Sequence, residues 1–411
     1  MGIRRPRVVL YSHDTMGLGH MRRNVLLART LAQSRLAAIT LMIAGAPEAA
    51  EVCAGAGVAC IALPPLAKGA DGRYTSRTLD VELQDLVALR GRTIRAAIEA
   101  FDPDALIVDN VPRGAQRELD EALMALRRRG HVRCVLGMRD VLDAAHTVRR
   151  EWHVARNILA IREFYDEVWI YGDPAVYDPV REYGLPQSVT GRTHYLGYLD
   201  QRSRLASTVD PWSRLAPSLK LPPGRLAVCA VGGGQDGAAL AEAFAEAERP
   251  PETNGLILTG PFMPQAHVAR LQRLAATRPR LGVLGYVQEP LWLLARADWI
   301  VAMGGYNSAC EILSLRKPAL LVPRVAPRRE QAIRAERLCE LGLVDTLNAE
   351  TLTPGRISEW LGRDRSPRAV RRPIDLNGLA RAADRLERLL MPARAAARRR
   401  EAVALGAACG A

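Results

Sequence analysis

The sequence contains three glycine-rich turns, and each of them joins a short apolar run to a segment with helical periodicity. The first turn spans residues 12–20 and contains Gly17, Gly19 and His20. Glycine allows a sharp turn and close approach of a ligand, and the N-terminus of the following helix offers unpaired N–H groups to an anion. His20 would lie at this helix end, where an imidazole that titrates near neutral pH can act as an acid or a base.

The second turn, 232–237, follows a predicted strand and opens a predicted helix. It includes Gly233, Gly234, Gln235 and Gly237, a pattern typical of a backbone nest for phosphate. The glycine spacing also fits a dinucleotide-binding fingerprint. However, no acidic residue closes the next predicted strand, Leu256–Thr259, which argues against a nicotinamide dinucleotide.

The third turn, 304–308, leads into a helix that carries Glu311 in its first turns, and Glu330 opens a later helix. Turn amides suit a phosphate, whereas carboxylates and amides accept hydrogen bonds from the paired hydroxyls of sugars. The candidate ligand-binding residues here are Gly304, Gly305, Asn307, Ser308, Glu311, Glu330 and Gln331.

The elements that must position these turns form two similar series. Apolar runs of strand length alternate with helical stretches, a pattern that indicates βαβ units and parallel sheets. An irregular segment, 200–224, separates the two series. The first series has predicted strands at 8–12, 39–44, 58–63, 105–109, 132–138 and 167–171, and helices at 21–33, 79–100, 114–129 and 147–164. The second has strands at 226–231, 255–259, 281–284, 299–302, 319–323 and 343–347, and helices at 237–247, 265–276, 289–296, 307–315, 330–341 and 354–361.

Composition bounds the class of protein. The chain has 411 residues, of which 48% are hydrophobic and 25% charged, as in globular proteins of two or three domains. No apolar run is long enough for a membrane span, and no signal peptide is evident, so a cytoplasmic protein is expected. Seven dispersed cysteines without a Cys-x-x-Cys pair argue against disulfides and against a zinc site.

The net charge of +13 comes almost entirely from arginine, which supplies 54 of the 57 basic residues. Aromatic residues make up only 5% and do not alternate with basic ones, so a nucleic-acid partner is not expected. Arg127–Arg129 and the basic tail 392–411 leave two interpretations open: solvated surface, or peripheral contact with an anionic membrane, at its inner face.

Residues 226–348 resemble the C-terminal donor domain of the GT-B glycosyltransferases, in particular family 28, the MurG-like peptidoglycan N-acetylglucosaminyltransferases. The resemblance rests on the turns at 232–238 and 304–308 with Glu311, on Gly285-Tyr286-Val287, and on Glu330-Gln331. The chain departs from the family at Tyr306 in the third turn and at Glu330-Gln331, which leaves the sugar open.

The resemblance implies an α/β fold of two Rossmann-like domains facing across a cleft. An acceptor domain, 1–199, would be followed by a donor domain, 200–375. The C-terminal helix, 376–391, would cross back onto the first domain.

It also implies a nucleotide-diphosphate sugar donor, with UDP favoured, and no cofactor or metal. The backbone of Val287 would contact the base, Glu311 the ribose, and Glu330 and Gln331 the sugar. The turns at 232–237 and 304–308 would hold the diphosphate.

An inverting transfer needs one general base within reach of the acceptor hydroxyl. The candidates are His20, ranked first, and Asp109 and Asp140, which each follow a strand and for which helix capping is the alternative. The expected activity is transfer of a hexose or N-acetylhexosamine to an unidentified acceptor, such as a lipid-linked or envelope glycan. A nucleotide-sugar hydrolase and a non-catalytic nucleotide-sugar binding protein remain as alternatives.

Overall fold

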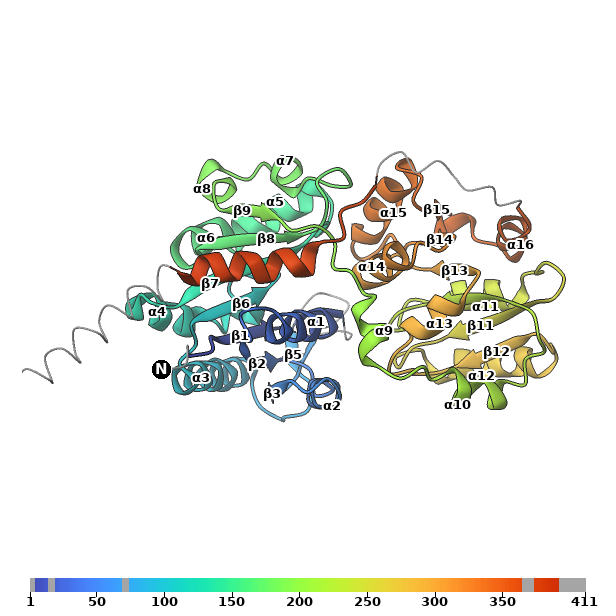
Figure 1. Ribbon diagram of the computed structural model, residues 1–411, viewed down its shortest axis with the longest axis horizontal. Coiled ribbons are helices and arrows are strands. Elements are labelled where there is room, and N and C mark those ends of the chain that lie inside the picture. The colour runs from blue at the N-terminus through green and yellow to red at the C-terminus, as the bar shows by residue number, and fades with distance from the viewer. Residues whose placement is uncertain (1–3, 14–18, 69–73, 364–372, 392–411) are drawn as a thin grey trace, which may run out of the picture.

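The structure is a computed structural model that describes residues 4–13, 19–68, 74–363 and 373–391 (Figure 1). Two α/β units stand side by side, each built on a parallel sheet. Gly17 and the tail 392–411 lie outside the described residues.

The first domain contains a seven-stranded parallel sheet. Alternate residues of the strand Arg7–Ser12 belong to different hydrophobic cores: Val8 and Leu10 pack on one face of the sheet, and Val9 and Tyr11 on the other. A parallel sheet covered by helices on both faces requires such continuous apolar strands. The order is β3-β2-β1-β6-β7-β8-β9, with β1 at Arg7–Ser12, β2 at Ile39–Ala44, β3 at Ala59–Ala62, β6 at Ala105–Asp109, β7 at Arg133–Arg139, β8 at Glu167–Tyr171 and β9 at Thr193–Tyr195.

Helices cover both faces of this sheet (Figure 1). A small antiparallel hairpin, β4 (Leu66–Lys68) with β5 (Tyr74–Ser76), lies outside it. The helices are α1 (Gly19–Gln33), α2 (Ala49–Gly55), α3 (Leu83–Phe101), α4 (Asp120–Arg129), α5 (Ala145–Val154), α6 (Asn157–Phe164), α7 (Pro179–Tyr183) and α8 (Gln187–Thr190), with a 3-10 turn at Ala115–Arg117.

The second domain repeats the plan with a six-stranded parallel sheet. The order is β12-β11-β10-β13-β14-β15, with β10 at Arg225–Ala230, β11 at Thr253–Leu258, β12 at Leu281–Leu284, β13 at Trp299–Ala302, β14 at Ala319–Leu321 and β15 at Asp345–Thr346. Its helices are α11 (Ala238–Glu246), α12 (Gln265–Ala276), α13 (Leu291–Arg296), α14 (Tyr306–Leu315), α15 (Glu330–Glu340) and α16 (Pro354–Gly362), with a 3-10 turn at Ala349–Thr351.

The chain passes between the domains twice. A helix over residues 378–391 lies along the first domain (the red helix of Figure 1), where Arg385 pairs with Glu167 of β8. Its Leu386 and Leu390 are buried in the same core cluster as Val8 of β1. The helix therefore adds a last layer to the first domain, two residues later than the sequence indicated.

Several predicted elements differ in the structure. The segment 200–224, expected to be irregular, contains α9 (Ser203–Ser207) and α10 (Trp212–Leu219). The single helix expected at 147–164 is two helices, because Arg156 adopts a left-handed conformation with φ of 54°. Apolar periodicity continues across that break, so the sequence pattern conceals it. Similarly, the helix expected from 114 begins at Asp120, and β9 and the β4–β5 hairpin are too short to show a clear alternation.

Candidate functional site

The two domains contact each other at the start of α1 and the start of α14. Asn307, in the first turn of α14, donates a hydrogen bond through Nδ2 to the carbonyl oxygen of Gly19, the first residue of α1, at 2.9 Å. The N-terminal ends of the two helices thus approach each other at the interdomain junction. Since such ends attract anions, the junction is suited to a charged group.

His20 lies one residue into α1 and contacts the end of β6. Its Nδ1 is 2.5 Å from Oδ2 of Asp109. Arg23, one helical turn further on, donates to both oxygens of Asp109, at 2.5 and 2.6 Å. Asp109 is 1% exposed, whereas 17% of the His20 side chain is accessible. His20 can therefore reach a ligand while a fully engaged carboxylate orients its ring.

Burial and neighbouring charges together determine the charge states of His20, Asp109 and His13. It lowers the pKa of His20, an effect that Asp109 opposes only in part. Burial alone would raise the pKa of Asp109, but Arg23 and His20 outweigh it and hold this pKa well below its ordinary value. Burial and the neighbouring His20 ring lower the pKa of His13 to about 3. His20 is thus a neutral base beside a permanent anion near pH 7.

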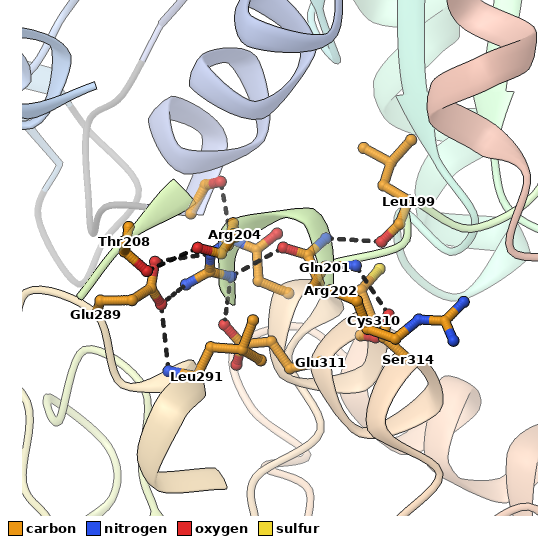
Figure 2. Close-up of polar contacts among 12 residues, drawn as sticks. Leu199, Gln201, Arg202, Arg204, Thr208, Glu289, Leu291, Cys310, Glu311 and Ser314 are labelled. Atoms are coloured by element: carbon orange, nitrogen blue, oxygen red, sulfur yellow. Dashed lines mark hydrogen bonds and ion pairs between the residues drawn. The ribbon is translucent and has the colours of Figure 1, made fainter. Parts of the chain in front are cut away.

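Glu311 lies on α14 and is paired with an arginine from the interdomain segment (Figure 2). Nη1 of Arg204, on α9, is 2.8 Å from its Oε1, and the other side of the guanidinium binds Glu289 at 2.5 Å. The two carboxylates outweigh burial and raise the pKa of Arg204. Val287 is half-buried two residues before Glu289. The expected ribose contact, Glu311, is therefore a member of this largely buried ion-pair cluster, and the expected base contact, Val287, lies two residues along the chain from Glu289.

The turn at 232–237 owes part of its glycine content to packing. Gly234 has φ of +91°, and a Cβ atom there would lie 2.0 Å from the carbonyl oxygen of Thr259. In the same turn Gly233 and Gln235 are exposed, and Gly237 is packed against Val231. The exposed backbone near Gly233 is the part that remains open to a ligand.

The third turn differs, because Gly305 has no neighbour within 4 Å of where a Cβ would stand. Gly304 is buried with φ of +85°, and Ser308 is half-buried in the first turn of α14. Gly305 is thus compatible with close approach of a ligand to the helix N-terminus.

Glu330 and Gln331 open α15 and share a partner. Oε1 of Glu330 is 3.0 Å from Nη2 of Arg324, which also binds Asp236 of the glycine turn at 2.8 Å. Gln331 donates to the carbonyl oxygen of Met303 at 2.8 Å and accepts from Nε of Arg324 at 3.3 Å. The buried Oε2 of Glu330 has no hydrogen-bond partner among the described residues. Arg324 therefore ties the expected sugar contacts to the expected diphosphate turn.

Asp140, a candidate base, is placed in a different setting. Its carboxylate is fully buried and binds Arg334 of α15, with Oδ1 2.7 Å from Nη2, and accepts from the Tyr198 hydroxyl at 2.8 Å. Arg334 also donates to the carbonyl of Gly304 at 3.1 Å. This geometry makes Asp140 an interdomain tie, with its oxygens occupied.

Four arginines that organise these groups were not predicted from the sequence: Arg23, Arg204, Arg324 and Arg334. Only Arg23 carries a local signal, because residues three apart on a helix are neighbours. The partners of Arg204 and Arg334 lie 107 and 194 residues away along the chain. The described residues contain no group of three or more His, Cys, Asp or Glu side chains that could hold a metal ion. Nor do they contain a helix with the length and apolar character that a membrane span requires.

No family model matches the chain. It is similar over 71 residues, at 44% identity, to a UDP-N-acetylglucosamine–N-acetylmuramyl-(pentapeptide) pyrophosphoryl-undecaprenol N-acetylglucosamine transferase of Geobacillus kaustophilus, covering 16% of this chain and 20% of that protein. It is also 33% identical over 111 residues to the NDP-glycosyltransferase YjiC of Bacillus licheniformis, covering 25% of this chain and 27% of that protein. The chain thus matches only a fifth to about a quarter of the length of these curated relatives.

Solved structures match almost the whole chain. The glycotransferase of kitacinnamycin superposes with a TM-score of 0.61 at 18% identity, covering 94% of this chain and all of that one. A UDP-GlcNAc 2-epimerase from Neisseria meningitidis superposes with a TM-score of 0.60 at 12% identity, covering 93% and 99%. The protein therefore has the GT-B fold, as predicted. Part of its sequence resembles the MurG-type transferases, and the fold itself also supports other chemistry on nucleotide sugars.

Proposed function

We propose that this protein is a glycosyltransferase that transfers a hexose or N-acetylhexosamine from a UDP-sugar to an acceptor hydroxyl, with inversion and without a metal. The contact between Asn307 and Gly19 carries this proposal. It brings His20 and Asp109, on the first domain, against the helix whose first turns hold the candidate donor residues. A base and a donor site on opposite domains suit transfer in a single displacement.

The ribose, the diphosphate and the sugar of the donor each have a counterpart in the second domain. Glu311 accepts from the ribose hydroxyls, and the turns at 232–237 and 304–308 hold the diphosphate. Glu330 and Gln331 bind the sugar. Helix N-termini and turn amides stabilise the charge that develops on the leaving diphosphate, which is how such a site works without a metal.

Replacing Glu311 by alanine is expected to abolish nucleotide binding, because it removes the proposed acceptor for the ribose hydroxyls. A thermal-shift screen of UDP-, GDP-, ADP- and dTDP-sugars measures this. A ligand at 100 times its Kd adds about 2.7 kcal/mol of stability to the protein. UDP-sugars are expected to stabilise the wild-type protein, and the shift is expected to be absent in Glu311→Ala.

A matched control is Glu242→Ala. Glu242 lies on α11 and pairs with His267 of α12, at 2.8 Å. It is expected to keep the full shift. If no nucleotide sugar stabilises the wild-type protein, the transferase proposal is abandoned. Release of UDP from a bound UDP-sugar at an undiminished rate without acceptor would instead identify a hydrolase.

We also propose that the acceptor is a lipid-linked or envelope glycan met at the cytoplasmic face of the membrane. The transferase of Geobacillus kaustophilus has a pyrophosphoryl-undecaprenol acceptor in its name. In this protein Arg127 and Arg128 are exposed at the end of α4. Val154 and Leu159, 78% and 52% exposed, lie beside Arg156 around a shallow hollow at α5 and α6, and α4 contacts α6. An apolar surface edged by arginine suits an anionic bilayer.

Removing two of these charges is expected to weaken membrane binding. Each basic residue near an anionic surface contributes about 1 kcal/mol to the free energy of membrane binding. The double variant Arg127→Gln with Arg128→Gln loses two such contributions, so its affinity for phosphatidylglycerol vesicles is expected to be about thirtyfold lower. Co-sedimentation at low and high salt measures this. The control pair Arg273→Gln with Arg356→Gln, exposed in the second domain, leaves binding unchanged. Equal binding by both double variants would exclude this surface as the contact.

A further inference from the structure

Arg139 is a half-buried arginine at the interdomain junction for which the structure shows no partner. It is the last residue of β7, next to Asp140. Among the described residues it makes no side-chain hydrogen bond or ion pair, and its Nε is buried without an acceptor. Three buried arginines of the first domain and the junction, by contrast, are paired: Arg23 with Asp109, Arg90 with Glu118, and Arg334 with Asp140.

The surroundings of Arg139 show why this is unusual. Burial and the nearby Arg23 lower its pKa to about 10, so it remains charged at neutral pH. Glu330 and Asp109 are acidic groups within electrostatic range of Arg139. Asp109 binds His20 and Arg23. Glu330 binds Arg324 through Oε1, and its buried Oε2 makes no hydrogen bond to Arg139 or to any other described residue. A partly buried charge without a partner is unfavourable, and a ligand that supplies the partner removes this cost.

The position of Arg139 indicates which part of a ligand it meets. The proposed diphosphate contacts, 232–237 and 304–308, belong to the second domain. Arg139 belongs to the first domain, where β7 lies beside β6, the strand that ends at Asp109. It is also within electrostatic range of His20, the proposed base. It therefore lies on the side from which the acceptor approaches.

We infer that Arg139 binds an oxyanion, a phosphate or a carboxylate, that the acceptor carries close to its reacting hydroxyl. This inference rests on the proposed transferase function and adds the substrate class to it. A guanidinium matches either oxyanion with two parallel hydrogen bonds, which a lysine cannot reproduce. The acceptor is thus an anionic molecule, and a neutral glycan is a poor substrate.

The test uses inorganic phosphate as the probe, with the full-length protein saturated by UDP so that the donor site is filled. Calorimetric titration is expected to show phosphate binding to the wild-type protein and binding at least about tenfold weaker in Arg139→Gln, since a hydrogen bond to a charged group is worth that factor or more. Arg139→Lys is expected to lie between the two. The control Arg162→Gln, an exposed arginine of α6, binds phosphate like the wild type.

Other readouts separate the alternatives. UDP affinity is expected to be unchanged in Arg139→Gln, and its melting temperature is expected not to fall, since the substitution removes an unpaired, half-buried charge. Equal phosphate binding by wild type and Arg139→Gln overturns the inference. A parallel loss of UDP affinity assigns Arg139 to the donor diphosphate and also overturns it. The inference is also overturned if the wild-type protein prefers UDP-glucuronate to UDP-glucose and Arg139→Gln loses this preference. Arg139 would then bind an anion on the donor sugar, not on the acceptor. Failure of the wild-type protein to bind UDP at all counts against the proposed function instead.

Discussion

Replacement of His20 by glutamine is expected to lower turnover of the UDP-sugar about 10²- to 10⁴-fold, the usual contribution of a general base. Glutamine keeps a polar side chain at the start of α1 but cannot accept the proton of an acceptor hydroxyl. The affinity for UDP is expected to stay the same, because the proposed donor contacts lie in the second domain. Initial rates of UDP release with acceptor present, together with UDP binding by calorimetry, measure both quantities.

The pH dependence gives this prediction a second readout. Burial lowers the pKa of His20 below its ordinary value of 6.5, so the neutral, base-competent form is present at and above neutral pH. Turnover is therefore expected to fall only as the pH drops below 6.5, and to be level near pH 7. In Asp109→Asn the carboxylate that raises the His20 pKa is gone, so the acid limb is expected to move to still lower pH.

A matched control for His20 is His146→Gln, which alters an exposed histidine of α5. It is expected to leave both the rate and its pH profile unchanged. If His20→Gln retained wild-type turnover, His20 would not be the base. An unchanged acid limb in Asp109→Asn would mean that a different group titrates.

The second large effect is expected on stability, from the buried pair of Asp140 and Arg334. Both side chains are 0% exposed, and they join the residue that follows β7 in the first domain to α15 of the second. Replacing Asp140 by alanine leaves the Arg334 guanidinium buried without its carboxylate. Breaking a buried pair in this way costs about 3–5 kcal/mol. Differential scanning calorimetry is expected to show a clearly lower melting temperature.

The double variant Asp140→Leu with Arg334→Met separates the roles of Asp140. It removes both charges, so most of the lost stability is expected to return. If Asp140 only ties the domains together, this variant also keeps measurable turnover. Complete loss of turnover in a stable double variant would restore Asp140 as a candidate base. Glu359→Ala, which breaks an exposed pair with Arg363 on α16, is the control and is expected to leave the melting temperature unchanged.

Much of the fold could be predicted because its signals are local. The apolar runs of β1, β6, β10 and β13 are buried on both faces, as parallel strands must be, and each is bounded by turn residues. The pattern failed where no such signal exists. The break at Arg156 lies within unbroken helical periodicity, and β9 has only three residues. In both places tertiary packing outweighs local preference.

The candidate site divides in the same way. A glycine turn followed by a helix is a contiguous feature, so Gly19, His20, Gly305 and Asn307 could be singled out from the sequence. The sequence could not predict which of these residues contact each other. The contact of Asn307 with Gly19 spans 288 residues and depends on how the two domains dock.

The sequence by itself therefore determined the two parallel α/β units, the three glycine turns and the residue types able to bind a nucleotide sugar. Only the tertiary structure decided which charges are satisfied. In the structure Asp109 pairs with His20 and Arg23, and Asp140 forms an ion pair with Arg334. Arg139 has no partner among the described residues. The physical reason is that the state of a buried charge depends on neighbours brought from distant parts of the chain, whereas a strand, a helix or a turn depends mainly on residues next to it.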